Sequence, residues 1–334
     1  MSGSALYGAL TMTDASPGSR STIIASQLDP ELNELLRAHP SKPTVIEVPE
    51  QRPWEIASEA EVLLVRPAPA WRFHGHNAAP SGWPGRVRWV FSATTGVDFY
   101  PRWMVANTPL CCARGVASEE IAEYVIAAIF AQAKNLDAIR ARSLADWKPI
   151  TLDRVQGSTI GLVGLGSIGS AVAKRALALG ARVIAVRKRP LPSPVPGVEV
   201  LDSLVDLVEA SDHIVLAVPA TDETFALFDG KLLSHVKPGA HLINVARGTV
   251  LDQTSLMNQL EDGSLAYATL DVTEPEPLPA GHPLYTHPKV RLTPHVASLH
   301  PTVSQALYEK IASNLARYLR GEALQDLVDP VLGY

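Results

Sequence analysis

The sequence contains little cysteine, no excess of basic charge and no long uninterrupted apolar run. Its only two cysteines, Cys111 and Cys112, are adjacent, which excludes a disulfide framework and favours buried thiols in a reducing compartment. The 29 basic and 34 acidic side chains leave a net charge of −5, which argues against a general nucleic-acid binder. The longest apolar stretch, residues 121–133, is interrupted by Glu123 and is shorter than the roughly 20 residues that span a membrane. We therefore expect a soluble, cytoplasmic protein that acts on small molecules, with neither nucleic acid nor membrane as a partner.

Two segments lack the companions that a targeting signal or a metal site would need. Residues 1–20 are rich in Ser, Gly, Thr and Ala but have no basic start followed by an apolar core, so we expect a flexible N-terminus rather than a secretory signal. His74 and His76 have alternate-residue spacing, but no companion Cys or acidic cluster completes a ligand set. We therefore predict no metal site.

Short β-branched or aromatic runs alternate with helical or Pro/Gly-rich segments, which is typical of an α/β fold. In the first part of the chain this pattern predicts strands at residues 21–25, 62–65 and 87–91. The segment from Asp29 to His39 is expected to form a helix with Pro30 in its first turn.

A second unit follows a long helical pattern at residues 117–145, which is broken near its end. Strand-like runs alternate with helices in this unit, at residues 159–163, 182–186, 213–218, 241–245, 266–270 and 290–292. Six strands in this arrangement predict a doubly wound parallel sheet. An amphipathic helix then starts at Pro301 and ends near Gly321.

The turn after the strand at 159–163 carries the glycine pattern Gly164-Leu165-Gly166-Ser167-Ile168-Gly169. Gly164 permits a tight turn, Gly166 lets the backbone approach a pyrophosphate, and Gly169 allows close packing of helix on strand. The N–H groups of Ser167 and Ile168 would point at negative charge. Because strand, turn and helix follow in the required order, this segment predicts a dinucleotide cofactor.

The next strand ends in a basic cluster, Arg187, Lys188 and Arg189, instead of a carboxylate. A carboxylate at this place accepts a hydrogen bond from the ribose 2′-hydroxyl, whereas arginine can pair with a 2′-phosphate and stack on adenine. We therefore expect NADP(H) to be preferred, with NAD(H) possible as a cofactor. A solvated basic loop with no ligand is the alternative explanation for the cluster.

Later segments place chemically useful side chains after three successive strands: Arg247, then Asp271, Glu274 and Glu276, then His295. An arginine there can hold a substrate carboxylate and polarise the adjacent carbonyl. A histidine paired with a carboxylate can donate and accept a proton, because the carboxylate orients the imidazole and stabilises its protonated form. Each residue alone could also be a surface ion pair or a structural side chain. Their joint order indicates hydride transfer to a 2-keto acid.

In these segments and their order, the chain resembles the D-isomer-specific 2-hydroxyacid dehydrogenases, close to their glyoxylate and hydroxypyruvate reductase branch. The resemblance covers residues 62–334. It implies that Arg247 binds and polarises the substrate, that His295 donates and accepts the proton, and that Glu276 is the carboxylate partner of that histidine. Asp271 would hydrogen-bond the nicotinamide carboxamide, or else be a structural turn residue. Further cofactor contacts are expected at Val218, Pro219 and Ala246.

The same resemblance extends to the first part of the chain. Thr95 and Gly96 match a loop that lends backbone amides to the substrate carboxylate, although the segment Thr94–Asp98 departs from the commoner Gly-Val-Gly form. Arg66 matches a further substrate contact, or is a plain surface arginine. Trp147 matches a tryptophan that reaches the active site of the partner subunit, or is an interface or core aromatic.

The resemblance also implies two Rossmann-like or flavodoxin-like doubly wound parallel-sheet domains with a cleft between them. The substrate-binding domain would be discontinuous, formed by residues 21–108 and 299–334, with a dinucleotide-binding domain at 109–298 inserted. The expected function is NADPH-dependent reduction of glyoxylate or hydroxypyruvate to the D-2-hydroxy acid by a homodimer. Two alternatives stay open: a bulkier or phosphorylated substrate, and a non-catalytic, corepressor-like protein that senses dinucleotides.

Overall fold

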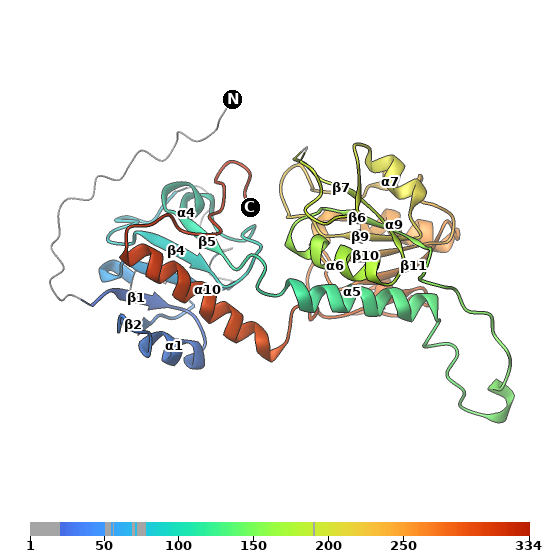
Figure 1. The fold of residues 1–334 in the computed structure, drawn as a ribbon, viewed down its shortest axis with the longest axis horizontal. Helices are drawn as coiled ribbons and strands as arrows, with labels where there is room; N and C mark the ends of the chain where they lie inside the picture. Colours follow the sequence, from blue (N-terminus) through green and yellow to red (C-terminus); the bar gives the residue numbers. More distant parts are fainter. Residues whose placement is uncertain (1–20, 51–54, 56, 69–70, 72–77, 190) are drawn as a thin grey trace.

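The computed structural model describes residues 21–50, 55, 57–68, 71, 78–189 and 191–334. Two α/β lobes lie side by side, and the chain crosses between them before the helix α5 (Ser118–Ala133) and again before the helix α10 (Pro301–Leu319) (Figure 1). The expected flexible N-terminus and the pair His74 and His76 lie outside the described residues. Within the described residues, no helix is long and apolar enough to cross a membrane.

The smaller lobe is built on a five-stranded parallel sheet in the order β2-β1-β3-β4-β5. Its elements are β1 Ile23–Ser26, α1 Pro30–Arg37, β2 Thr44–Glu47, η1 Ala57–Glu59, β3 Val62–Val65, β4 Trp89–Ser92, α4 Arg102–Asn107, β5 Leu110–Cys112 and α10 Pro301–Leu319. The central strands β3 and β4 are buried along their whole length, as continuous apolar runs predict. One face is covered by α10, which returns from the far end of the sequence and packs Leu307, Ile311 and Leu315 into the core.

Two features of this lobe differ from the sequence-based expectation. The expected domain boundary at residues 108 and 109 is too early, because β5 is hydrogen-bonded to β4 and completes the five-stranded sheet. The strand β2 was not expected, because only Val45 in it is buried and no apolar run marks it. Cys111 and Cys112 are buried free thiols, as expected, and burial raises the pKa of Cys111 to about 12.

The larger lobe is built on a seven-stranded parallel sheet in the order β12-β11-β10-β9-β6-β7-β8. Its elements are α5 Ser118–Ala133, η2 Leu144–Asp146, β6 Thr159–Val163, α6 Ser167–Ala178, β7 Arg182–Val186, β8 Glu199–Leu201, α7 Leu204–Ala210, β9 His213–Leu216, α8 Gly230–Leu233, β10 Ala240–Asn244, η3 Gly248–Val250, α9 Gln253–Glu261, β11 Leu265–Leu270, η4 Pro283–Tyr285 and β12 Val290–Leu292. The edge strand β8 joins the six expected strands. The order reverses between β6 and β9, which is the place where such sheets bind their ligands.

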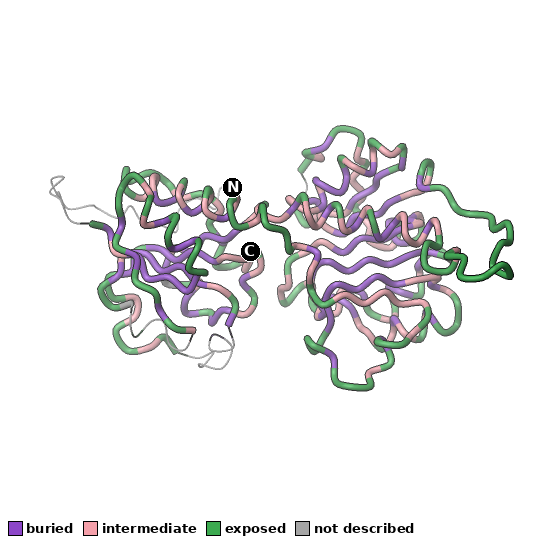
Figure 2. Tube along the Cα trace, turned by 90° about the horizontal axis from the view of Figure 1, so that it is seen from below, coloured by how far each residue is buried: buried purple, intermediate pink, exposed green. Residues whose placement is uncertain are grey.

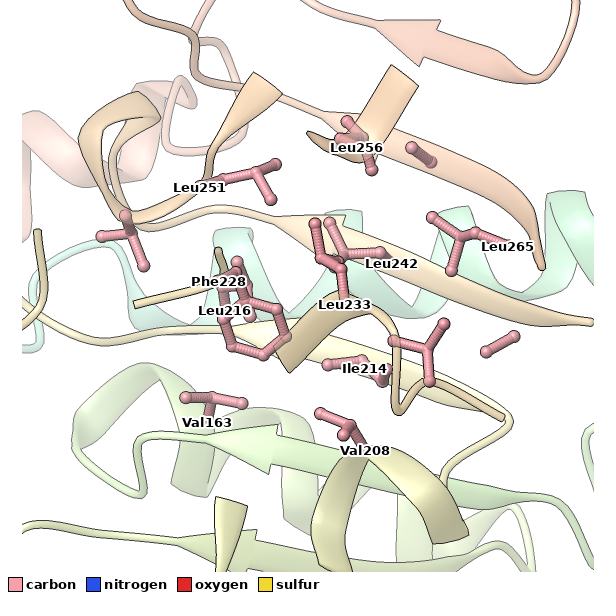
Figure 3. Close-up of a cluster of buried hydrophobic side chains, with 14 of the residues drawn as sticks. Val163, Val208, Ile214, Leu216, Phe228, Leu233, Leu242, Leu251, Leu256 and Leu265 are labelled. Carbon is pink, nitrogen blue, oxygen red and sulfur yellow. The ribbon is translucent and has the colours of Figure 1, made fainter. Parts of the chain in front are cut away.

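Both faces of the larger sheet are covered by apolar side chains. On one face, Ile214, Leu216 and Leu242 pack with Phe228 and Leu256 from the surrounding connections and helices (Figure 3). The opposite face packs against α5 and α6. Packing on both faces of the sheet holds the carboxyl ends of its strands in place, and the expected site residues follow these ends.

The helix α5 ends at Ala133, well before the end of the long helical pattern. Asn135 takes a left-handed backbone conformation, with φ 46°, and stops the helix. Residues 134–154 then form a projecting segment, which extends away from both lobes (Figure 1). Residues 140–154 of this segment are exposed along their whole length (Figure 2).

Candidate active site

The glycine turn forms an anion cradle between β6 and α6. Gly164 has a φ of +102°, and a Cβ there would lie 2.5 Å from the carbonyl oxygen of Ala217, so the turn requires glycine. A Cβ on Gly166 would meet nothing within 4 Å, so the backbone faces open space here. The helix α6 begins at Ser167 with no side-chain cap, and its N-terminus favours negative charge. These features fit the pyrophosphate of a dinucleotide.

A pocket of about 370 Å³ extends from this cradle and has walls from both lobes. It is lined by ten of the twelve expected cofactor residues: Gly164, Gly166, Ser167, Ile168, Arg187, Lys188, Arg189, Val218, Pro219 and Ala246. Gly169 is not one of its lining residues because it packs beneath the turn, where a Cβ would lie 2.2 Å from the oxygen of Gly164. We call this space the dinucleotide pocket. The smaller lobe contributes Thr95, Gly96 and Arg114 to it.

Arg247 lies in the same pocket, directly against the loop of the smaller lobe. Its Nε donates to Oδ1 of Asp98 at 3.3 Å, and its Nη1 donates to the carbonyl oxygen of Ala246 at 2.8 Å. A Cβ on Gly96 would lie 1.8 Å from Nη2 of Arg247. Only glycine therefore lets the guanidinium approach this loop so closely. The contact holds a cation beside the backbone of Thr95 and Gly96, where a carboxylate could bind.

His295 and Glu276 form a pair at the neighbouring strand ends, with 2.7 Å between Nδ1 and Oε1. The backbone of His295 is left-handed, with φ 53°, which is uncommon for a residue other than glycine and is often found at functional sites. Its N–H donates to the carbonyl oxygens of Asp271 at 2.9 Å and Thr293 at 3.0 Å. Within the described part of the chain, Glu274 makes no such contact with the histidine.

Asp271 supports the loop that carries this histidine. Its carboxylate is buried and accepts hydrogen bonds from the Thr293 hydroxyl at 2.6 Å and from the N–H groups of Val296 at 2.9 Å and Ala297 at 3.0 Å. Since the Thr293 proton points at Asp271, the Tyr124 hydroxyl donates to Thr293, at 2.6 Å. Burial raises the pKa of Tyr124, which keeps this phenol a neutral donor. In the structure, Asp271 therefore stabilises the conformation of the loop that carries His295.

The expected site residues are divided between two pockets. Asp271, Glu276 and His295 line a second pocket, of about 650 Å³, whereas Arg247 lines the dinucleotide pocket. The two sets are carried by the carboxyl ends of the adjacent strands β10, β11 and β12. Among the described residues, no group of three or more His, Cys, Asp or Glu side chains could hold a metal ion.

Comparison with known proteins identifies the larger lobe. Residues 126–297 match the family model of the D-isomer specific 2-hydroxyacid dehydrogenase, NAD binding domain. The chain belongs to the D-isomer specific 2-hydroxyacid dehydrogenase family. It is therefore an NAD(P)-dependent dehydrogenase in class, and its two parallel-sheet lobes are the fold of that family.

Several members of the D-isomer specific 2-hydroxyacid dehydrogenase family align with most of the chain. Glyoxylate/hydroxypyruvate reductase A of Serratia proteamaculans is 32% identical over 75% of this chain and 82% of its own length. Glyoxylate reductase of Thermofilum pendens is 37% identical over 67% of this chain and 68% of its own. A D-isomer specific 2-hydroxyacid dehydrogenase from Xanthobacter autotrophicus Py2, solved with NADPH and MES, superposes with a TM-score of 0.78 at 27% identity, covering 95% of this chain and 100% of that one.

Arg66 is not placed at the site. Its Nη1 pairs with Asp29 at 3.0 Å and its Nη2 with Glu50 at 2.7 Å, and it lines neither of the two pockets. Two carboxylates of its own lobe thus pair with the guanidinium, which favours the alternative of a surface arginine, and the substrate contact stays a prediction. Trp147 lies on the projecting segment and is 79% exposed, so it is not a core aromatic.

The lining residues of the dinucleotide pocket that were missed in the sequence include Asp98, Arg114, Glu223 and Tyr334. Asp98 stands in the loop already singled out for Thr95 and Gly96, so its neighbours were a signal for it. Tyr334 had none, because it reaches the pocket from the far end of the sequence and lies between the lobes (Figure 1). The chain there is fixed by Asp329, whose Oδ1 accepts from Val331 N at 2.8 Å.

Proposed function

We propose that this dehydrogenase reduces a small 2-keto acid, glyoxylate or hydroxypyruvate, to the D-2-hydroxy acid with NADPH. The observation that carries the proposal is the 2.7 Å contact between His295 and Glu276, next to the strand end that bears Arg247. The glyoxylate reductases among the relatives support the substrate. Reduction is favoured as the direction because cellular NADPH pools usually drive it.

Preference for the phosphorylated cofactor is supported by charge. Arg187, Lys188 and Arg189 line the pocket at the end of β7, where a 2′-phosphate would lie, and no carboxylate follows that strand. A related structure that was solved with NADPH agrees with this preference. NADPH, when bound, supplies the hydride that adds to the keto carbon.

In the proposed mechanism, Arg247 binds the substrate carboxylate and polarises the carbonyl beside it. The backbone of Thr95 and Gly96 completes the carboxylate site from the other lobe. His295 gives its proton to the oxygen as it becomes an alkoxide, and Glu276 stabilises the imidazolium and orients the ring. Closure of the lobes would join the two pockets and exclude water from the reacting atoms.

We further propose that the working form is a homodimer whose projecting segments reach the partner. Leu144 is 88% exposed, Trp147 79% and Ile150 53%. Large apolar side chains gathered on one exposed segment are typical of an interaction site. The second pocket, beside His295, offers Tyr267, Tyr285 and Leu278 as apolar contacts for such a segment.

Turnover tests the function directly. NADPH or NADH consumption would be followed by absorbance with glyoxylate, hydroxypyruvate, pyruvate and bulkier or phosphorylated keto acids. We expect the highest kcat/KM for one of the first two substrates with NADPH, and a loss of about 10²-fold or more in His295→Asn. Much faster oxidation of D-2-hydroxy acids with NAD would contradict the assignment. Binding of NADPH with no turnover of any substrate would favour a dinucleotide-sensing protein instead.

A further inference from the structure

A carboxylate opposes the basic cluster inside the dinucleotide pocket. Glu223, in the connection after β9, forms an ion pair with Lys188, which follows β7. Both residues line the pocket, and their side chains are 66% and 48% exposed. The two acidic residues among the described lining residues are Glu223 and Asp98, and Asp98 is engaged by Arg247. Glu223 is therefore the acidic group that faces the cations of the cofactor site.

The connection that carries Glu223 is held in one conformation by hydrogen bonds. The Thr224 hydroxyl donates to the carbonyl oxygen of Pro219 at 2.7 Å and accepts from Thr221 N at 2.9 Å. Thr224 N donates to the carbonyl oxygen of Thr221 at 3.0 Å. Because the backbone on both sides of Glu223 is fixed, its carboxylate stays within reach of Lys188.

The neighbouring carboxylate points elsewhere. Asp222 pairs with Arg102 of the smaller lobe at 3.2 Å and is not a lining residue of the dinucleotide pocket. Two adjacent acidic residues thus have separate partners on separate lobes. Asp222 provides a matched control for any effect of charge in this turn.

We propose that Glu223 sets how strictly the pocket selects a 2′-phosphorylated dinucleotide. This inference rests on the proposed cofactor, and it concerns a specificity-determining residue outside β7. The group at the ribose 2′ position lies beyond the end of the second strand of such a domain, where Lys188 and Glu223 meet. A 2′-phosphate competes with Glu223 for the Lys188 ammonium and is repelled by the carboxylate. An unphosphorylated ribose instead finds in Glu223 the hydrogen-bond acceptor that β7 lacks.

The pocket should therefore accept both cofactors, with a moderate preference for NADPH. Three cations attract the 2′-phosphate, and one fixed carboxylate reduces that attraction. Since exposed ion pairs contribute modestly, removal of the carboxylate should change the affinity for NADPH by about two- to fivefold. The affinities for NADPH and NADH should change in opposite directions when the carboxylate is removed.

Binding measurements on the purified chain test this without turnover. Dissociation constants would be measured by calorimetry for NADPH, NADH, 2′-AMP and 5′-AMP with the unmodified protein, Glu223→Gln and Asp222→Asn. We expect Glu223→Gln to tighten the binding of NADPH and 2′-AMP by about two- to fivefold and to weaken the binding of NADH. Asp222→Asn should leave the ratio of the NADPH and NADH constants unchanged. In Lys188→Ala, the Glu223→Gln substitution should lose most of its effect on NADPH.

The outcomes separate this inference from the proposed function. If the unmodified protein prefers NADPH and Glu223→Gln leaves the ratio of constants unchanged, the role of Glu223 is wrong and the function stands. An undiminished effect of Glu223→Gln in the Lys188→Ala background would refute competition for the ammonium. If the unmodified protein binds neither dinucleotide, or prefers NADH, the proposed cofactor itself fails.

Discussion

At the scale of single residues, the position of His295 depends more on backbone than on its own side chain. Its left-handed φ of 53° is maintained by two hydrogen bonds from its N–H and by the Asp271 carboxylate beneath the loop. This conformation is tolerated by histidine better than by β-branched residues. The loop therefore presents the imidazole to Glu276 before any substrate arrives, which reduces the cost of positioning.

Substituting Glu276 by Gln should lower kcat by about 10- to 100-fold, a part of the effect of a full acid–base group. The amide can still accept a hydrogen bond from His295, but it no longer stabilises the protonated imidazole. In the reduction direction, activity should therefore disappear at a lower pH on the alkaline side of the pH–rate profile. Steady-state rates across the pH range measure both effects.

Glu274 provides the control for that substitution. It lies two residues away, is exposed, and makes its contact with Gln253 through the backbone. Glu274→Gln should keep both kcat and the shape of the profile. An unchanged alkaline limb in Glu276→Gln, or equal losses in both variants, would contradict the assignment of the carboxylate partner.

Residues at strand ends could be predicted from the sequence because parallel strands bring their carboxyl ends to one edge. The chain places Arg247, Glu276 and His295 at that edge for this reason. Arg66 also follows a strand, yet it is captured by Asp29 and Glu50. Which carboxylate lies within reach of a cation depends on the register of distant strands and on loop conformation. The spacing of residues in the sequence determines neither the register of the strands nor the conformation of the loops.

At the scale of elements, the inner strands of both sheets were predictable, whereas the edge strands β2, β5 and β8 were missed and only the edge strand β12 was expected. The strands β3 and β6 are buried along all or nearly all of their length, whereas β2 and β8 are largely unburied. An edge strand needs apolar side chains on little of its surface, so its pattern is weak. The end of α5 was missed for a different reason: the helical pattern continues past Ala133 into a segment whose residues 140–154 are exposed and have no core to pack against.

Two histidines buried in the larger sheet should make its stability depend on pH. His213 in β9 and His241 in β10 lie with 3.3 Å between their Nδ1 atoms. Burial lowers the pKa of His213 from 6.5 to about 4, and it lowers that of His241 well below 6.5. In the unfolded chain these two histidines take up protons near pH 6.5, whereas in the folded chain they stay neutral at that pH. The free energy of unfolding should therefore fall as pH drops from about 6.5 to 4, by roughly 3 kcal/mol for His213.

Urea unfolding at a series of pH values measures this slope. His213→Gln should make the free energy of unfolding depend less on pH between 6.5 and 4, whatever the substitution costs at neutral pH. The reason is that one group that is protonated only in the unfolded chain is removed. The exposed His235 provides the control, and His235→Gln should keep the original slope. Equal slopes in the unmodified protein and His213→Gln would show that the buried pair does not govern acid stability.

At the scale of the whole molecule, the cleft is formed by three separate stretches of sequence. The loop at Thr95, the large lobe, and the segment ending at Tyr334 all line the dinucleotide pocket. The last of these is attached to the smaller lobe, because Val328 N donates to the carbonyl oxygen of Leu110 at 2.8 Å. Movement of one lobe against the other would thus carry Tyr334 with it. The ion pair between Arg247 and Asp98 crosses the same cleft.

The projecting segment should hold two copies of the chain together. Sedimentation equilibrium at micromolar concentration should give twice the mass of one chain for the unmodified protein. Leu144→Ser combined with Trp147→Ser should shift the population toward one chain, because both side chains are more than three-quarters exposed and are expected to be covered only by the partner. Phe225, 69% exposed elsewhere on the surface, provides the control Phe225→Ser, which should remain dimeric. Since these residues contribute little to the core of one chain, the circular dichroism spectrum should be unchanged in all variants. A mass of one chain for the unmodified protein would refute the dimer.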